Sequence, residues 1–223
     1  MARLMTTPDA RRQRMVADHL RRRDINDPQV LAAFATVPRE RFVPDPLLER
    51  AYDDVPLPIG SGQTISQPYV VAITAQALAL TGHERVLEIG TGSGYAAAVL
   101  GQLAREVHTV ERIEELARTA AIRLVELGFH NVYVHHGDGT LGWPSNAPYE
   151  AIAVAAGAPR PPPALLEQLT IGGRLVVPTG PSEQQRLVRI TREGHHQYVE
   201  EDLGDVRFVP LLGEQGWPVP TSS

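Results

Sequence analysis

The chain of 223 residues contains no cysteine and no lysine, so all 21 of its basic residues are arginines. The lack of cysteine excludes disulfides, thiolate metal sites and a thiol nucleophile. It also lacks an apolar run long enough to cross a bilayer, and its first residues show no apolar segment of signal-peptide length. Hydrophobic residues make up 43% and charged residues 21%. We therefore expect a globular protein of the cytoplasm without a membrane partner.

The chain also has fewer basic than acidic residues, with a formal net charge of -5 and a pI of about 5.9. This balance argues against a general nucleic-acid binder, whose affinity for phosphates needs a positive field. Arginines do gather over residues 11–23, but aspartates interrupt them. A solvated helix face is favoured there over an RNA contact, and no nucleic-acid partner is expected.

Before residue 85 the pattern predicts helices separated by a long connection. An apolar stripe over 9–22 suits a surface helix, and Asp27 before Pro28 is typical of a helix start, with that helix running through Phe34. Prolines over 38–58 predict an extended connection that is functional or wraps the core. A further helix begins at Pro68, with Ser66 or Gln67 as its cap.

From residue 85 onward, short apolar runs alternate with helical segments. Strands are predicted over 85–89, 107–110, 132–135, 151–155 and 174–177, and helices over 95–103, 113–127 and from 163 through 169. This alternation predicts an α/β fold with a doubly wound, mostly parallel sheet covered on both faces. Runs over 186–191, 197–202 and 206–209 predict an antiparallel edge, with a hairpin turn at Glu193-Gly194. We expect one domain: a substrate-cleft element over 1–68, a cofactor-binding core over 69–180 and final strands over 181–223.

The first predicted buried strand carries Glu88 next to its last residue, Ile89, and the run Gly90-Thr91-Gly92-Ser93-Gly94 follows, just before a helix. A glycine-rich turn at this point lets the backbone approach a nucleotide-like ligand closely. Dinucleotide enzymes prefer the spacing G-x-G-x-x-G and bring a pyrophosphate to the helix start. Glu88 would repel a pyrophosphate, whereas S-adenosylmethionine offers a cationic amine and sulfonium.

Two more acids follow the next strands. Glu111 is placed to accept the ribose hydroxyls, and Asp138, before Gly139, to accept from the adenine amino group. The alternative is that each acid is an isolated surface residue and the glycines only form tight turns. Agreement of strand spacing and charge favours an S-adenosylmethionine site. These residues say nothing about the methyl acceptor.

Sequence motifs along nearly the whole chain resemble the protein-L-isoaspartate O-methyltransferase family. The most specific is P-I-G-S-G-Q-T-I-S-Q-P over 58–68. Other matching runs are V-P-R-E-R-F-V (37–43), V-L-E-I-G-T-G-S-G-Y (86–95), V-E-R-I (110–113), H-G-D-G (136–139), L-L-E-Q-L (165–169), G-G-R-L-V-V-P (172–178) and R-F-V-P-L (207–211). The family's alanine- and proline-rich turn reads Ala155-Ala156-Gly157-Ala158-Pro159, with an inserted glycine, and the match fades after Leu211.

The resemblance implies a monomeric repair enzyme that methylates the free α-carboxyl of L-isoaspartyl residues in damaged proteins and peptides. It implies that the ester then collapses to a succinimide, which hydrolyses partly to aspartate. Ser66 matches the active-site serine, and Thr64, Ile65 and Gln67 the methyl-transfer pocket. Residues that match cofactor positions are Glu88, Gly90, Thr91, Gly92, Ser93, Glu111, Asp138 and Gly139, and Val209 and Pro210 match a segment over the substrate.

Chemistry agrees with this reading, because a carboxylate with an ordinary pKa near 4 is ionised at neutral pH and needs no general base. Ser66 need only orient an oxygen, although a serine there could instead be a helix cap. Adjacent histidines at 135–136 and 195–196 point to opposite strand faces, which suits no single metal ion, so no metal is expected. Two alternatives stay open: a methyltransferase for one dedicated peptide aspartate, and a non-catalytic cofactor-binding adaptor.

Overall fold

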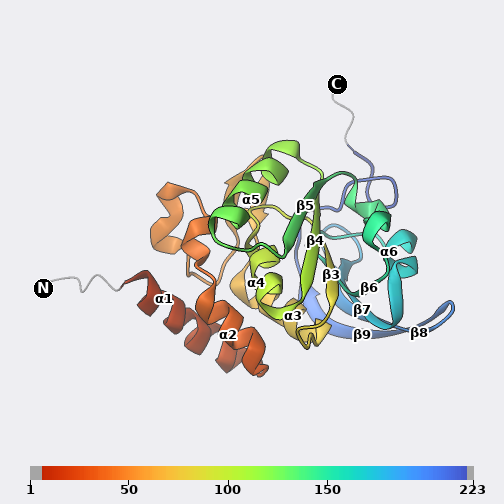
Figure 1. Cartoon of the computed structure of the whole chain (residues 1–223), viewed down its shortest axis with the longest axis horizontal. Helices are drawn as coiled ribbons and strands as arrows, with labels where there is room; N and C mark the ends of the chain where they lie inside the picture. The colour runs from red at the N-terminus through yellow and green to blue at the C-terminus, as the bar shows by residue number, and fades with distance from the viewer. Residues whose placement is uncertain (1–6, 220–223) are drawn as a thin grey trace, which may run out of the picture.

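A computed structural model describes residues 7–219, and its centre is a seven-stranded sheet with the order β5-β4-β3-β6-β7-β8-β9 (Figure 1). The first five strands in this order are parallel, and the last two join antiparallel. Their bounds are β3 Arg85–Ile89, β4 Glu106–Glu111, β5 Val132–His136, β6 Tyr149–Val154, β7 Leu169–Thr179, β8 Gln185–Gly194 and β9 Gln197–Val206. The predicted α/β fold with an antiparallel edge is confirmed.

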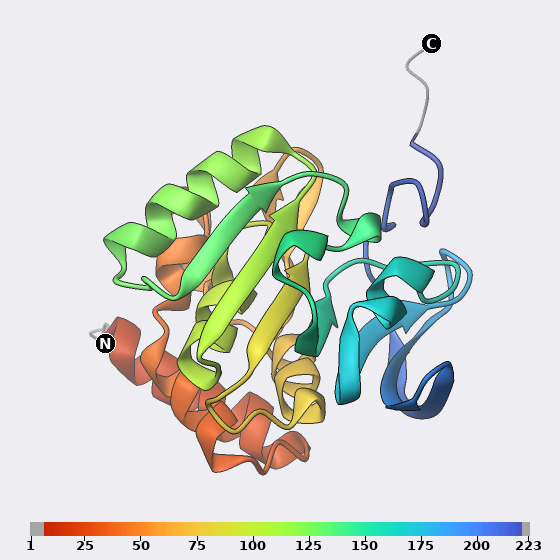
Figure 2. The ribbon, with the colours of Figure 1, turned by 45° about the vertical axis from the view of Figure 1, so that its right-hand side comes forward.

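Helices lie on both faces of the sheet (Figure 2). One face is covered by α3 Pro68–Leu78, α4 Tyr95–Leu103 and α5 Glu114–Glu126, and the short α6 Pro163–Glu167 lies on the other. Residues of β3 alternate between two buried clusters. Val86 belongs to the cluster that contains α3 and α4, while Leu87 and Ile89 belong to the cluster that contains α6. The central strand β3 is therefore buried on both faces, as strands within a parallel sheet are.

The strand order reverses at β3, which pairs with β4 on one side and with β6 on the other. At such a point the chains leaving neighbouring strands diverge to opposite faces and open a crevice at the carboxyl ends of the strands. The glycine-rich loop over 90–94 follows β3 directly, so it forms part of this crevice. The fold therefore places the predicted cofactor loop at the switch point of the sheet.

The N-terminal part packs outside α3 and α4. The expected helix over 9–22 is α1 Pro8–Met15, which continues as a π-helical turn over Val16–Leu20. Asp27 caps α2 Pro28–Thr36 by accepting hydrogen bonds from the backbone N–H groups of Gln29 and Val30, as its sequence predicted. The long connection is less extended than expected, because it contains 3₁₀ turns at Arg39–Phe42 and Asp45–Arg50 and a hairpin of β1 Leu57–Gly60 with β2 Gln63–Ile65.

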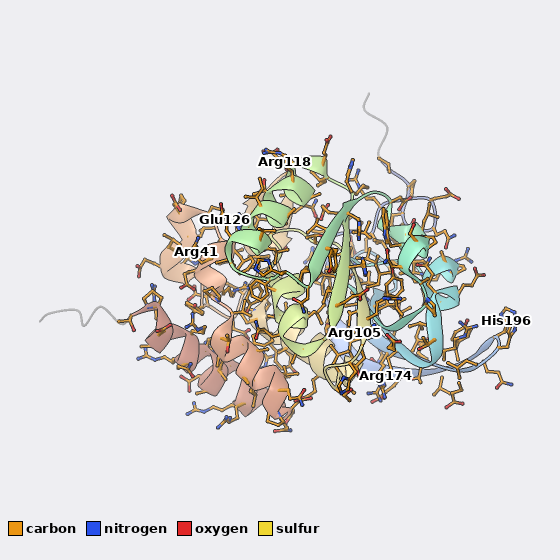
Figure 3. All side chains as sticks on the ribbon, in the orientation of Figure 1. Arg41, Arg105, Arg118, Glu126, Arg174 and His196 are labelled. Atoms are coloured by element: carbon orange, nitrogen blue, oxygen red, sulfur yellow. The ribbon has the colours of Figure 1, made fainter. Side chains whose placement is uncertain are left out.

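The prediction of a separate strand over 206–209 is wrong, because β9 ends at Val206. The side chain of Gln185 takes the place of a strand partner there. It accepts from the backbone N–H of Phe208 at 2.7 Å and donates to the Phe208 carbonyl at 3.2 Å. β7 also starts at Leu169 rather than Arg174, so the helix predicted through Leu169 ends earlier, at Glu167. The hairpin turn predicted at Glu193-Gly194 is placed two residues too early, because these residues end β8 and the turn is formed by His195 and His196, with His196 at its tip (Figure 3).

Within residues 7–219, no helix combines the length and apolar character needed to cross a membrane. Residues 1–6 and 220–223, which belong to the expected first and last parts of the domain, lie outside the described residues.

Candidate active site

An open cavity lies at the carboxyl ends of β3 and β4 and holds about 930 Å³ of empty space. It is lined by the β2 end with the residue after it, the glycine-rich loop with the start of α4, the end of β4, Gly139 after β5, the turn after β6 and the segment after β9. Among the predicted site residues, those that line it are Thr64, Ile65, Ser66, Gly90, Thr91, Gly92, Ser93, Glu111, Gly139, Val209 and Pro210. Most of the predicted residues therefore meet at one place.

The backbone of the loop explains its glycines. Gly90, Gly92 and Gly94 have φ values of 94°, 53° and 91°, a region that side chains rarely adopt. A Cβ on Gly139 would lie 2.5 Å from the side chain of Ile89, so this position also requires glycine for close packing. The loop can turn sharply and leave its backbone open toward the cavity.

Glu111 lines the cavity and holds the loop in place. One carboxylate oxygen accepts from the backbone N–H of Gly92 and the other from that of Ile113, both at 2.9 Å. Charge-assisted bonds of this kind are among the stronger hydrogen bonds in proteins. The acid thus fixes the loop, and its role toward the ribose hydroxyls stays a prediction.

Glu88 is buried behind the loop rather than in the cavity wall. Its carboxyl accepts from the hydroxyl of Thr109 at 2.5 Å, and that hydroxyl lies 2.6 Å from the hydroxyl of Thr91. Burial raises the pKa of Glu88 to about 8, and the nearby charge of Glu111 adds to the rise while the Thr109 hydrogen bond opposes it. Direct contact of Glu88 with a cofactor amine stays a prediction.

Asp138 makes its hydrogen bonds to the chain itself. One carboxylate oxygen accepts from the backbone N–H and hydroxyl of Thr140, and the other from the backbone N–H of Glu214 at 2.8 Å. It therefore anchors the C-terminal segment, which adds Leu211 and Leu212 to the cavity lining. The role of Asp138 toward adenine stays a prediction, and no motif marked Leu212 in the sequence.

The inserted glycine in the turn after β6 is part of the same anchorage. Gly157 donates to the Val209 carbonyl, and its own carbonyl accepts from the backbone N–H of Leu211 and the indole N–H of Trp217. A Cβ on Gly157 would lie 2.3 Å from the side chain of Gln185. This departure from the family pattern therefore fits close packing of the segment that carries Val209 and Pro210.

Ser66 lies where the cavity meets a second, larger groove. The groove holds about 1780 Å³ of empty space and is lined by α3 residues and by the chain from Leu203 to Val209, together with Thr64, Ser66 and Gln67. The helix cap is Gln67, and α3 has no side-chain capping bond, so Ser66 does not serve as the cap. Ser66 therefore lines both the cavity and the groove.

Asp54 was missed by sequence reasoning, because no motif surrounds it. Its carboxylate accepts from the Gln67 side chain at 2.9 Å, from the backbone N–H of Tyr69 at 3.0 Å and from Arg23 at 2.8 Å. Arg23 also lies over the ring of Tyr69 at 3.7 Å. The N-terminal connection thus holds the segment that carries Ser66.

The histidines have other partners. His135 lies 2.9 Å from His108 and stacks on Trp143, while His136 lies against the Arg112 carbonyl. His195 and His196 are exposed at the hairpin tip. Among residues 7–219 no group of three or more potential ligands is arranged to hold a metal ion.

Three comparisons place this arrangement among known proteins. Residues 10–216 match the family described as protein-L-isoaspartate(D-aspartate) O-methyltransferase (PCMT). A protein-L-isoaspartate O-methyltransferase from Rhodopseudomonas palustris is 57% identical over 207 residues, which cover 92% of this chain and 95% of the relative. A solved protein-L-isoaspartate O-methyltransferase is 30% identical with a TM-score of 0.84, covering 92% of this chain and 67% of that one.

A second solved structure shows the fold alone at 24% identity, with a TM-score of 0.77 over 90% of this chain and 98% of the other. It is described as a putative Plasmodium falciparum protein-L-isoaspartate O-methyltransferase in complex with S-adenosyl-L-homocysteine.

Proposed function

Because the chain belongs to the protein-L-isoaspartate(D-aspartate) O-methyltransferase family, we propose that it methylates the free α-carboxyl of L-isoaspartyl residues in damaged proteins and peptides. The methyl donor is S-adenosylmethionine, and the product ester is an intermediate of protein repair. The observation that carries the assignment is the position of Ser66, which borders both the cavity and the groove.

The residues in the cavity fit this cofactor. The glycine-rich loop leaves room for close approach, and the carboxylate of Glu111 suits a ribose diol at the end of the second strand. Thr64, Ile65 and Ser66 form the wall on the groove side and would face the methyl-donating end, with Gln67 next to them in the groove. When bound, the cofactor supplies an electrophilic methyl carbon, which gains a bond to the carboxylate oxygen while the electron pair of its C–S bond stays on sulfur.

The side chains of this chain have little proton chemistry to perform. An isoaspartyl α-carboxylate is already ionised at neutral pH, so no base is needed beside it. The Ser66 hydroxyl donates one hydrogen bond that orients a carboxylate oxygen, while Val209 and Pro210 cover the junction and exclude water. Positioning supplies most of the rate acceleration.

Replacement of Ser66 by alanine tests this assignment. We expect turnover with an isoaspartyl peptide to fall by about tenfold or more, because one orienting hydrogen bond is lost, while cofactor affinity changes little. The exposed Ser145→Ala exchange, outside both compartments, is the matched control. Normal turnover of the Ser66 variant would show that the hydroxyl does not orient the substrate.

Substrate class is tested with labelled S-adenosylmethionine and two peptides that differ only in aspartyl or isoaspartyl linkage. We expect label on the isoaspartyl peptide alone. Equal labelling of both would contradict repair specificity. Label on neither peptide would instead favour a dedicated peptide substrate or a cofactor-binding adaptor.

We further propose that the protein works as a cytoplasmic monomer, as one domain in which 1–68 and 181–223 flank the cofactor-binding core over 69–180. Support for a monomer is that residues of one chain line both the cavity and the groove. A partner nucleic acid is disfavoured by the net charge of -5 and by ion pairs between N-terminal arginines and acids, such as Arg11 with Glu49. Light scattering, cell fractionation and binding assays with RNA test these three points.

A further inference from the structure

Arg39 is an arginine whose side chain is wholly buried, with 0% of its surface exposed. Its Nε donates to the carbonyl of Ala51 and its Nη2 to the carbonyl of Ser66, each at 2.8 Å. The guanidinium carbon lies 4.7 Å from the centre of the Tyr95 ring. One planar group therefore contacts the N-terminal connection, the serine segment and the first residue of α4.

Stability alone does not account for a cation at this position. Within residues 7–219 the guanidinium has no carboxylate ion-pair partner, and its Nη1 makes no hydrogen bond. Moving a charge out of water costs several kcal/mol, and apolar replacement of buried charged groups is often neutral or stabilising. Burial lowers the pKa of Arg39, which reflects the same cost.

The contacts of Arg39 bear on the junction between the cavity and the groove. Tyr95 follows the glycine-rich loop, lines the cavity and is held edge-on by Phe34 and Phe42, with ring centres 6.0 and 5.6 Å away. Its ring is thus a fixed support. The guanidinium, resting on this support, sets how far the Ser66 backbone lies from α4 and so from the cofactor loop.

We propose that Arg39 is a positioning residue for methyl transfer, which holds the Ser66 backbone so that the serine hydroxyl meets the substrate carboxylate beside the cofactor cavity. This proposal rests on the orienting role of Ser66 proposed above. Arg39 itself touches neither the cavity nor the groove. It acts through the Ser66 carbonyl.

The first test is Arg39→Lys, which keeps the charge but cannot span two carbonyls with a rigid fork. We expect kcat with an isoaspartyl peptide to fall by about tenfold or more, because a displacement near 1 Å can cost up to about a hundredfold. The dissociation constant of the cofactor should stay within about twofold, since the loop contacts of Glu111 are untouched. Arg39→Met, which replaces the charge by an apolar side chain of similar length, should likewise lower kcat and leave the dissociation constant of the cofactor unchanged.

Arg12→Lys is the matched control. Arg12 also donates through Nε to a backbone carbonyl, that of Ala35 at 2.8 Å, and through Nη1 to Tyr52 at 3.3 Å, but it does not reach the serine segment. We expect this variant to lower the melting temperature with kcat unchanged. Equal losses of kcat in the Arg12 and Arg39 variants, or a normal kcat in both Arg39 variants, would overturn the proposal.

A double-mutant cycle with Ser66→Ala shows whether Arg39 acts through Ser66, because this exchange keeps the carbonyl that Arg39 binds. If it does, Arg39→Lys should lower kcat by less than about threefold further in the Ser66→Ala background. Fully additive losses would contradict the proposal while leaving the role of Ser66 intact. A Ser66→Ala variant with normal turnover would instead refute the proposed role of Ser66, whatever Arg39→Lys does.

Discussion

The cavity and the groove meet at Ser66, but they are built in different ways. The cavity floor comes from consecutive β–α units of the sheet, and its shape depends on backbone conformation at Gly90 and Gly92 and on the carboxylate of Glu111. The groove is assembled from parts of the chain that lie far apart in sequence, namely Pro56 in the long connection, the segment over 64–73 and the chain from Leu203 to Val209.

Side chains, rather than a regular ladder, hold the groove together. Asp54 fixes Gln67 and Tyr69 across 13 and 15 residues, and Gln185 fixes Phe208 across 23. The cavity is thus specified by local backbone geometry and the groove by single long-range contacts. Mutations in the two regions should therefore separate cofactor affinity from turnover.

The largest effect is expected from Glu111→Ala on the cavity side. One carboxylate oxygen holds the backbone N–H of Gly92 in the loop and the other that of Ile113 after β4, and hydrogen bonds to charged groups contribute roughly 1.5–3 kcal/mol each. The cofactor dissociation constant should rise by about ten- to a hundredfold, with kcat at saturating cofactor nearly unchanged. Calorimetric titration with S-adenosyl-L-homocysteine measures the affinity, and Glu115→Ala on the exposed side of α5 is the control. A large loss of kcat at unchanged affinity would contradict the division between the two regions.

Asp54→Ala on the groove side is expected to have a smaller effect, and this effect falls on kcat/KM for the peptide rather than on cofactor affinity. The exchange frees the Gln67 side chain and the backbone N–H of Tyr69, so kcat/KM for an isoaspartyl peptide should fall by about tenfold. Cofactor affinity should stay within about twofold. Steady-state kinetics with varied peptide provide the measurement.

The neighbouring residue offers a close control for this experiment. Among residues 7–219 the Asp53 side chain pairs only with Arg50, and both side chains are at least half exposed. Exposed pairs contribute about 0–1 kcal/mol to stability, so Asp53→Ala should leave both constants as they are. Equal behaviour of the two aspartate variants would mean that the bonds of Asp54 do not shape the groove.

The same contrast explains what could be predicted from the sequence. The parallel sheet, its antiparallel edge and the loop after β3 follow from patterns a few residues long, such as the apolar strand and the glycines of 86–94. Ser66 could be found only through the family signature around it. Arg39 stands in the matching run V-P-R-E-R-F-V and Asp54 in no matching run, and neither position indicated its contacts, because their partners lie 27 and 13 residues away.

The structure differs from the sequence-based expectation at 206–209 and at Asp138, and each difference has a clear physical cause. The run over 206–209 alternates as a strand does, but the amide of Gln185 satisfies the backbone of Phe208 in place of a partner strand. Asp138 follows its strand as expected, yet its carboxylate is engaged by Thr140 and Glu214, and nothing in H-G-D-G indicates that a segment 76 residues later returns to it.

The last effect concerns stability, with little expected change in activity, and it belongs to the cavity side alone. The pKa of Glu88 is raised to about 8 by burial, whereas in the unfolded chain it is about 4.3. Between these values the folded chain keeps a proton that the unfolded chain has released, so the free energy of unfolding falls as pH rises. Glu88→Gln should remove this slope, as urea unfolding at a series of pH values would show.

Glu84→Gln is the control for this slope, because hydrogen bonds from Thr81 and its neighbours lower the pKa of Glu84. Its contribution to stability is present above the unfolded pKa and is lost only as pH falls through the lower folded value. Glu84→Gln should therefore leave the slope between about pH 4.3 and 8 unchanged. A wild-type slope in Glu88→Gln would show that the proton resides elsewhere, and the chain from Glu88 through Thr109 to Thr91 would then be held by an ionised carboxylate.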